Sequence, residues 1–255
     1  MKSIRLSNQE KIIIFALIAI SVMAWFFTVR HSQSMGSDMT MAEEPIIPGL
    51  LLYLVMWTVM MIAMMFPAIT PIVLLFSTVH EKRRVKNEGF VPTWVFVAGY
   101  LLVWAVFGVL AYFVDIMITR LAMNYPKLQP FGHFISGAVL IISGLYQLTP
   151  LKNICLTHCR SPLHFIMHKW REGYSGSLIM GIDHGAYCLG CCWGLMIVLF
   201  VVGIMNMSWM GILTLIIFVE KTGKHGVLIS RFVGVSLIIL GVVIIVRPEM
   251  FFYIL

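Results

Sequence analysis

Charged side chains are scarce in this chain: Asp, Glu, Lys and Arg make up 11% of its 255 residues, whereas 60% are hydrophobic. Soluble domains usually carry roughly 25% charged residues, so this composition excludes an ordinary soluble protein. The chain also lacks an internal repeat, a low-complexity segment and any sizeable polar region. It therefore predicts a single integral membrane domain covering residues 1–255, with the lipid bilayer as its surroundings.

The net charge of +7 does not indicate a nucleic-acid partner. Lys and Arg occur in short segments between apolar runs rather than as a continuous patch, which is the arrangement of topology signals in membrane proteins. We therefore expect no nucleic-acid binding.

Seven apolar stretches can be assigned as membrane spans, at residues 12–29, 50–79, 94–118, 131–148, 174–205, 207–219 and 227–246. Pro67 and Pro71 are expected to kink or break the second stretch. No small-residue cleavage site follows the first stretch, which favours a retained helix over a signal peptide. The fold class predicted is an all-α polytopic transmembrane helix bundle of seven spans, or six if residues 174–219 are counted differently.

The distribution of basic residues predicts the orientation. With the N-terminus inside, only four of the 18 Lys and Arg residues fall in outside segments, namely Arg30, Arg120, Lys127 and Arg247. This positive-inside bias indicates a multi-pass protein of the cell (plasma) membrane with a cytoplasmic N-terminus. Loop 30–48 would then face outward, and the segment around Cys155 would face the cytoplasm.

Cysteine is also scarce, and its five copies fall into two groups, each with a His within four residues. The groups are Cys155 with Cys159, beside His158, and Cys188 with Cys191 and Cys192, after His184. An odd count and a reducing cytoplasm argue against a disulfide framework. Clustering with His is instead typical of a metal site.

In a helix, His184, Cys188 and Cys191 are spaced at i, i+4 and i+7 and share one face, with Asp183 and Cys192 beside it. An ionised Asp183 within the membrane would cost about 2.5–3.5 kcal/mol, which favours a partner, a cavity or an ion at that position. The candidate metal ligands are therefore His184, Cys188, Cys191, Cys192 and Asp183. Cys155, His158 and Cys159 would form a second site or donate to the first.

Thiolate together with thioether favours Cu(I), whereas thiolate, imidazole and carboxylate together also suit zinc. Loop 30–48 contains His31, Met35, Met39 and Met41, which could wrap a Cu(I) ion, although this loop is equally an unstructured connector. Five further Met residues recur at helical spacing between positions 56 and 65, which favours packing over a conduit for a soft ion. Copper is thus the expected metal, and zinc the alternative.

Three other interpretations use the same residues. The thiols could be small core residues, with His184 bonded to a backbone carbonyl and Asp183 paired with a basic residue. Cys188 and Cys191 form a Cys-x-x-Cys pair that could act in a membrane thiol–disulfide relay. A metal-dependent enzyme subunit with Asp183 or Glu220 as a base is a further alternative, although no substrate pocket is evident and a non-enzymatic role is favoured.

Several strings resemble a family of bacterial and archaeal proteins of unknown function, described as predicted metal-binding integral membrane proteins. They lie at residues 60–67, 146–162, 184–193, 202–209 and 220–221, and the resemblance covers most of the chain. It implies metal binding, and a Met-bearing first loop in relatives favours copper. Asp183 departs from the family, whose members have a basic residue before the His. The function expected is metal handling or delivery, with a membrane copper enzyme or a copper chaperone as partner.

Overall fold

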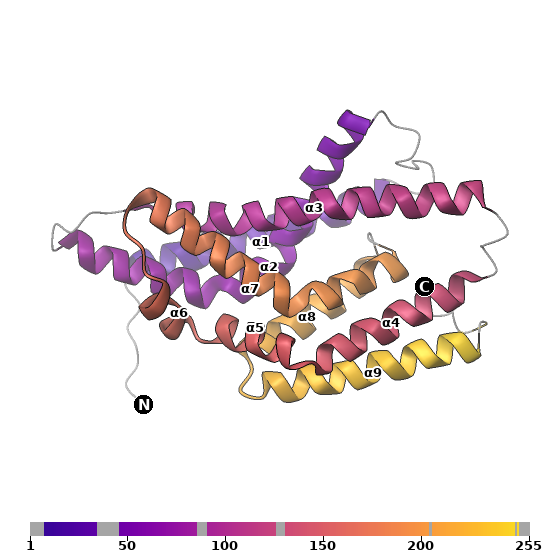
Figure 1. The fold of residues 1–255 in the computed structure, drawn as a ribbon. Coiled ribbons are helices and arrows are strands. Elements are labelled where there is room, and N and C mark those ends of the chain that lie inside the picture. Colours follow the sequence, from indigo (N-terminus) through magenta and orange to yellow (C-terminus); the bar gives the residue numbers. More distant parts are fainter. Residues whose placement is uncertain are drawn as a thin grey trace.

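The computed structural model describes residues 8–34, 46–85, 91–125, 131–203, 206–247 and 249, and within these ranges the chain is helical and has no strand, as predicted. Its long helices lie side by side in an elongated bundle (Figure 1). The helices are α1 (Asn8–Ser34), α2 (Ile46–Val85), α3 (Thr93–Asn124), α4 (Gly132–Leu148), α5 (Pro150–Arg160), α6 (Pro162–Lys169), α7 (Gly173–Val202), α8 (Met207–Thr222) and α9 (Gly226–Val246).

Five helices, α1, α2, α3, α7 and α9, are long and apolar enough to cross a membrane. A sixth span results if α4 and α5, which are bent by 62° at their junction, are taken together. Helix α8 has 16 residues, or about 24 Å at 1.5 Å per residue, which is less than the hydrocarbon core of about 30 Å. Among the described residues, the expected seven spans are thus corrected to five or six.

The turn between α7 and α8 explains that difference. Helix α7 ends at Gly203, whose φ of 95° lies in the left-handed region that favours glycine. The stretch assigned at 207–219 therefore forms a separate helix, α8, which is too short for the span expected there.

Helix α2 continues through Pro67 as a single helix, so of the expected kink or break, the break does not occur. A proline has no N–H to donate, so the carbonyl one turn earlier, that of Ala63, loses its partner within the helix. Two side chains of α1 replace it: Ser21 Oγ donates to Ala63 O at 2.9 Å and Trp25 Nε1 donates to the same oxygen at 3.1 Å. The proline therefore becomes the point at which α1 is bonded to α2.

Glycines bring two pairs of helices into backbone contact. A Cβ on Gly181 of α7 would lie 2.1 Å from Phe96 O of α3, so the side chains of α3 and α7 meet at short range. Along one edge of the bundle, α4 and α9 run antiparallel (Figure 1), because Gly137 meets Gly241 and Gly144 meets Gly234. The small residues of 131–148 thus allow close helix packing.

The polar segment after α4 folds into two short helices that lie across the bundle. Thr149 caps α5 by accepting a hydrogen bond from Lys152 N at 3.3 Å, and Pro150 and Pro162 occupy the first turns of α5 and α6. At its far end, Arg160 donates to the carbonyl of Gly223 and, at 3.1 Å, to that of Lys224, in the turn before α9. Helix α5 is thereby held against α7 and the α8–α9 turn.

Candidate metal centre

Helix α7 presents the predicted face of His184, Cys188 and Cys191 to the interior of the bundle, where they are 2%, 0% and 2% exposed. Cys192 is buried beside them. The thiols of Cys191 and Cys192 donate to the carbonyl oxygen of Cys188 at 3.1 Å and 2.8 Å. Each of these hydrogen bonds uses the proton of its own thiol. Loss of that proton would break the bond and leave the thiolate sulfur free to bind a metal ion.

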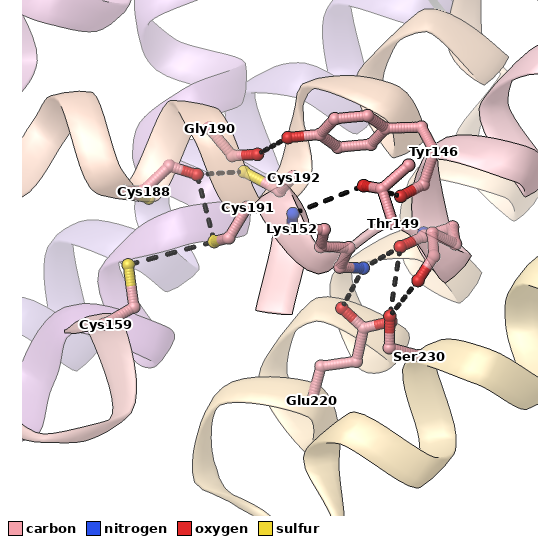
Figure 2. Close-up of polar contacts among 11 residues, drawn as sticks. Tyr146, Thr149, Lys152, Cys159, Cys188, Gly190, Cys191, Cys192, Glu220 and Ser230 are labelled. Carbon is pink, nitrogen blue, oxygen red and sulfur yellow. Dashed lines mark hydrogen bonds and ion pairs between the residues drawn. The ribbon is translucent and has the colours of Figure 1, made fainter. Parts of the chain in front are cut away.

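A fourth thiol reaches this face from α5. Cys159 Sγ lies 3.8 Å from Cys191 Sγ, although 32 residues separate the two cysteines (Figure 2). The two sequence clusters are therefore joined in one place. We call Cys159, Cys188, Cys191 and Cys192 the sulfur cluster.

Two other predicted ligands of α5 contact α7 without joining the sulfur cluster. Cys155 packs on the α7 backbone, since a Cβ on Gly190 would lie 2.9 Å from Cys155 Sγ. His158 stacks on the Tyr187 ring at 4.6 Å, and its Nδ1 lies 2.9 Å from Ile154 O on its own helix.

A buried ammonium group lies against the sulfur cluster. Lys221, which is 8% exposed, donates from Nζ to Cys188 Sγ at 2.9 Å, and Tyr100 Oη lies 3.1 Å from the same sulfur. A neighbouring cation stabilises a thiolate over a thiol. The cluster thus combines several sulfur donors with a positive charge suited to them.

Next to the sulfur cluster lies a second buried polar group, visible in Figure 2. Lys152 Nζ donates to Glu220 Oε2 at 2.8 Å and also to Gln147 Oε1, and Ser230 Oγ donates to Gln147 O at 3.2 Å. The side chains of Lys152 and Glu220 are 0% and 2% exposed. The ion pair joins α5 to α8, and the hydrogen bonds of Gln147 join α4 to α5 and α9. This polar group therefore links four helices next to the sulfur cluster.

Asp183 points away from the sulfur cluster. Its Oδ2 lies 3.9 Å from Lys169 Nζ, and the side chain is 30% exposed. The pairing with Lys169 accounts for the charge of Asp183 without a bound metal ion.

His184 has a different environment from its neighbours. The rings of Phe96, Phe165 and Tyr100 surround it at centroid distances of 6.0, 5.3 and 6.1 Å. Within the described part of the chain, its buried Nδ1 has no hydrogen-bond partner. The expectation that this His bonds to a backbone carbonyl is thus not supported at Nδ1.

The secondary candidates are only partly described. His31 lies on α1, where it stacks on Phe27 at 6.1 Å, whereas Met35, Met39 and Met41 lie outside the described residues. The Met residues between positions 56 and 65 of α2 are 0–4% exposed, so they pack inside the bundle rather than against lipid.

Sequence reasoning missed the two lysines and Tyr100. From the sequence, Glu220 is considered only as a candidate base, and Lys152 and Lys221 only as members of the strings that resemble the family. Their burial depends on α5 and α8 folding back onto α7, for which the local sequence carries no signal.

In the geometry described for these ranges, no group of three or more His, Cys, Asp or Glu side chains is arranged around a common metal position. The sulfur cluster instead offers a close pair of thiols with a third sulfur one turn away. Soft sulfur donors of this kind select Cu(I). The donor set therefore fits a monovalent soft ion.

Comparisons with known proteins agree with a copper-related assignment. No curated protein and no solved structure matches the chain. A family model described as "PpoB2: Copper chaperone" matches residues 54–244, which include α3 to α8 and the whole sulfur cluster. The chain belongs to this copper chaperone family.

Proposed function

We propose that the protein carries Cu(I) at the sulfur cluster, with Cys159 and Cys191 as its two thiolate ligands and Cys188 beside them in contact with Lys221. The observation behind this proposal is the 3.8 Å separation of two buried sulfurs from different helices. Two sulfurs that share an ion through bonds of about 2.3 Å lie at most about 4.6 Å apart. Cys159 and Cys191 could therefore bind one ion between them by moving apart by less than about 1 Å.

Charge balance supports Cu(I) over zinc. Cu(I) bound by two thiolates carries one negative charge, and the ammonium of Lys221 beside Cys188 offsets it. A divalent ion with the same two ligands would leave the buried site positive, which is unfavourable in a low-dielectric interior. Structural zinc also takes four ligands, more than the described side chains bring together.

The family description supports delivery rather than storage, and the apolar helices support a membrane location. We infer that the chain sits in the cell membrane as a single helical domain with its N-terminus in the cytoplasm. The ion would pass to a copper protein at the membrane by exchange of one thiolate ligand at a time.

The test is a competition titration of the anaerobically purified full chain with Cu(I) and a chromogenic Cu(I) chelator. Cys159→Ser and Cys191→Ser should each lose the tight equivalent of copper. Cys155→Ser, one turn earlier on α5, is the matched control and should retain it. Full copper content in the Cys159→Ser/Cys191→Ser double variant would refute the proposal.

A thiol–disulfide relay is the second candidate, because Cys159 and Cys191 are close enough to be oxidised together. In that case, the purified protein would cycle between free thiols and a disulfide with a dithiol partner, and Cu(I) would not compete. Counting thiols before and after loading with Cu(I) separates the two functions, since bound copper should protect both thiols from alkylation.

A further inference from the structure

His80, near the end of α2, is buried without any polar partner. Its side chain is 3% exposed, and its ring packs beside those of Phe76, at 4.5 Å, and Trp170, at 4.9 Å. Among the described residues, neither Nδ1 nor Nε2 of His80 has a hydrogen-bond partner. Neither the sequence motifs nor the sulfur cluster accounts for this residue.

Packing alone gives no reason for an imidazole here. Burying a polar group without a hydrogen bond costs free energy that an apolar ring of similar shape would not. Buried atoms of this kind require an explanation, and one explanation is a ligand that is bound only part of the time. The unpaired nitrogens of His80 are good donors for a copper ion.

Aromatic rings connect His80 to His184. Phe76 contacts Phe96 at 4.8 Å, and Phe96 lies 6.0 Å from His184, whose Nδ1 is likewise buried and unpartnered within the described ranges. His184 is one turn along α7 from Cys188, so an ion that leaves the sulfur cluster toward the start of α7 meets His184 first.

A buried thioether lies on α7 near His184. Met180, one turn before His184 on α7, is fully buried, and its sulfur accepts a hydrogen bond from Arg171 N at 3.4 Å. Arg171 follows Trp170, whose ring lies 4.9 Å from that of His80. Met180, His184 and Cys188, spaced four residues apart, thus form a row of soft donors on one face of α7 that runs toward its start.

We propose that His184, Met180 and His80 form a transfer route for Cu(I) between the sulfur cluster and the end of α2. This inference rests on the proposed function and adds the path by which the ion enters or leaves. Imidazole and thioether bind Cu(I) without carrying charge, so they hold the ion more weakly than thiolates do. A route needs that property, because a tighter intermediate position would trap the ion.

The charged residues near His80 do not exclude a bound monovalent cation. Arg83 lies 5.1 Å from the Trp170 ring centroid, and its positive charge is offset by Glu172, whose Oε1 lies 2.6 Å from Arg83 Nη2. Arg83, a basic residue beside Trp170, is therefore half of an ion pair.

The test loads the anaerobically purified full chain with one equivalent of Cu(I) and follows its transfer to bathocuproine disulfonate by absorbance. His80→Phe keeps the stacked ring and removes the nitrogens, and it should slow the transfer about tenfold while the equilibrium affinity stays unchanged. His80→Gln, which keeps a polar side chain, should also slow the transfer. His133→Phe on α4 is the matched control and should transfer at the wild-type rate.

The outcomes separate the two proposals. Tight Cu(I) binding by the wild type together with wild-type transfer rates in both His80 variants would overturn the route and leave the sulfur site standing. Failure of the wild type to bind Cu(I) would overturn both. Slower transfer in both His80 variants with unchanged affinity would support the route, because a purely structural effect at His80 would change affinity or melting temperature as well.

Discussion

Lys221 is what distinguishes the sulfur cluster from a group of packed thiols. Lys221→Met keeps the length and the burial of the side chain but removes the charge that balances a copper dithiolate. We expect the Cu(I) affinity to fall about 10- to 100-fold, as it does when groups next to metal ligands are removed. Competition with a chromogenic Cu(I) chelator measures this change.

Lys224→Met serves as the control, because Lys224 is an exposed residue of the neighbouring turn whose backbone carbonyl, rather than its side chain, accepts the hydrogen bond from Arg160. Unchanged Cu(I) affinity in Lys221→Met would show that the ammonium serves folding only.

The buried pair of Lys152 and Glu220 is expected to act on stability instead. Lys152→Met leaves the Glu220 carboxylate, which is 2% exposed, without its cation, and removing one partner of a buried pair typically costs about 3–5 kcal/mol. Adding Glu220→Gln should restore much of this loss. Thermal unfolding of the two variants in detergent measures the difference, and equal melting temperatures would contradict a coupled pair.

At the residue scale, the sequence predicted what a single helix determines. The spacing of His184, Cys188 and Cys191 predicted their common face, and burial confirms it. The 3.8 Å approach of Cys159 to Cys191 could not be predicted, because it depends on the bend between α4 and α5. The partner of Asp183 was foreseen only as one alternative, since a Lys169 contact requires α6 to lie beside α7.

The crossing of α3 and α7 positions Tyr100 beside Cys188, and it depends on Gly181. In Gly181→Ala, the added Cβ would lie 2.1 Å from Phe96 O, so the helices must separate. We expect a loss of about 1–3 kcal/mol in unfolding free energy, the usual cost of overpacking. Gly211→Ala on α8 is the control, because nothing lies within 4 Å of its added Cβ. Equal melting temperatures for these two variants would contradict the backbone contact.

The bonding of α1 to α2 at Ala63 gives a second prediction for an element. Ser21→Ala/Trp25→Phe removes both donors to Ala63 O, and an unsatisfied buried carbonyl costs about 1–3 kcal/mol. In a Pro67→Ala background, residue 67 regains an N–H for Ala63 O, so the same double substitution should cost less. Urea or thermal unfolding of the four proteins measures the coupling, and an identical cost in both backgrounds would exclude this role for the proline.

Helices were predictable where hydropathy and capping act locally. The spans at 94–118 and 227–246 lie within α3 and α9, and the Thr149–Pro150 and Ser161–Pro162 pairs are start signals for α5 and α6. Of the kink or break expected at Pro67, the break does not occur, because donors from another helix satisfy the carbonyl that the proline leaves unpaired. The count of seven spans was too high, because the stretch at 207–219 forms a helix of only 16 residues.

For the whole molecule, the direction of α3 and α7 determines which ends of the bundle lie on opposite sides of a membrane. Helices α3 and α7 run in the same direction, because Phe96 and Gly99 meet Gly181 while Tyr100 and Val103 meet Gly185. From Gly99 to Asn124, α3 rises about 38 Å at 1.5 Å per residue, more than the hydrocarbon core of about 30 Å. Asn124 and the start of α7 therefore belong on opposite sides of a membrane.

The basic residues Lys169 and Arg171, just before α7, predict that its start faces the cytoplasm. Asn124→Cys should then react with a membrane-impermeant maleimide in intact cells, whereas Ser175→Cys should react only after lysis. Both positions are exposed, and the unsubstituted chain corrects for native thiols. The reverse labelling pattern would invert the orientation, and the His80 end of the route would then lie on the outer side of the membrane instead of the cytoplasmic side.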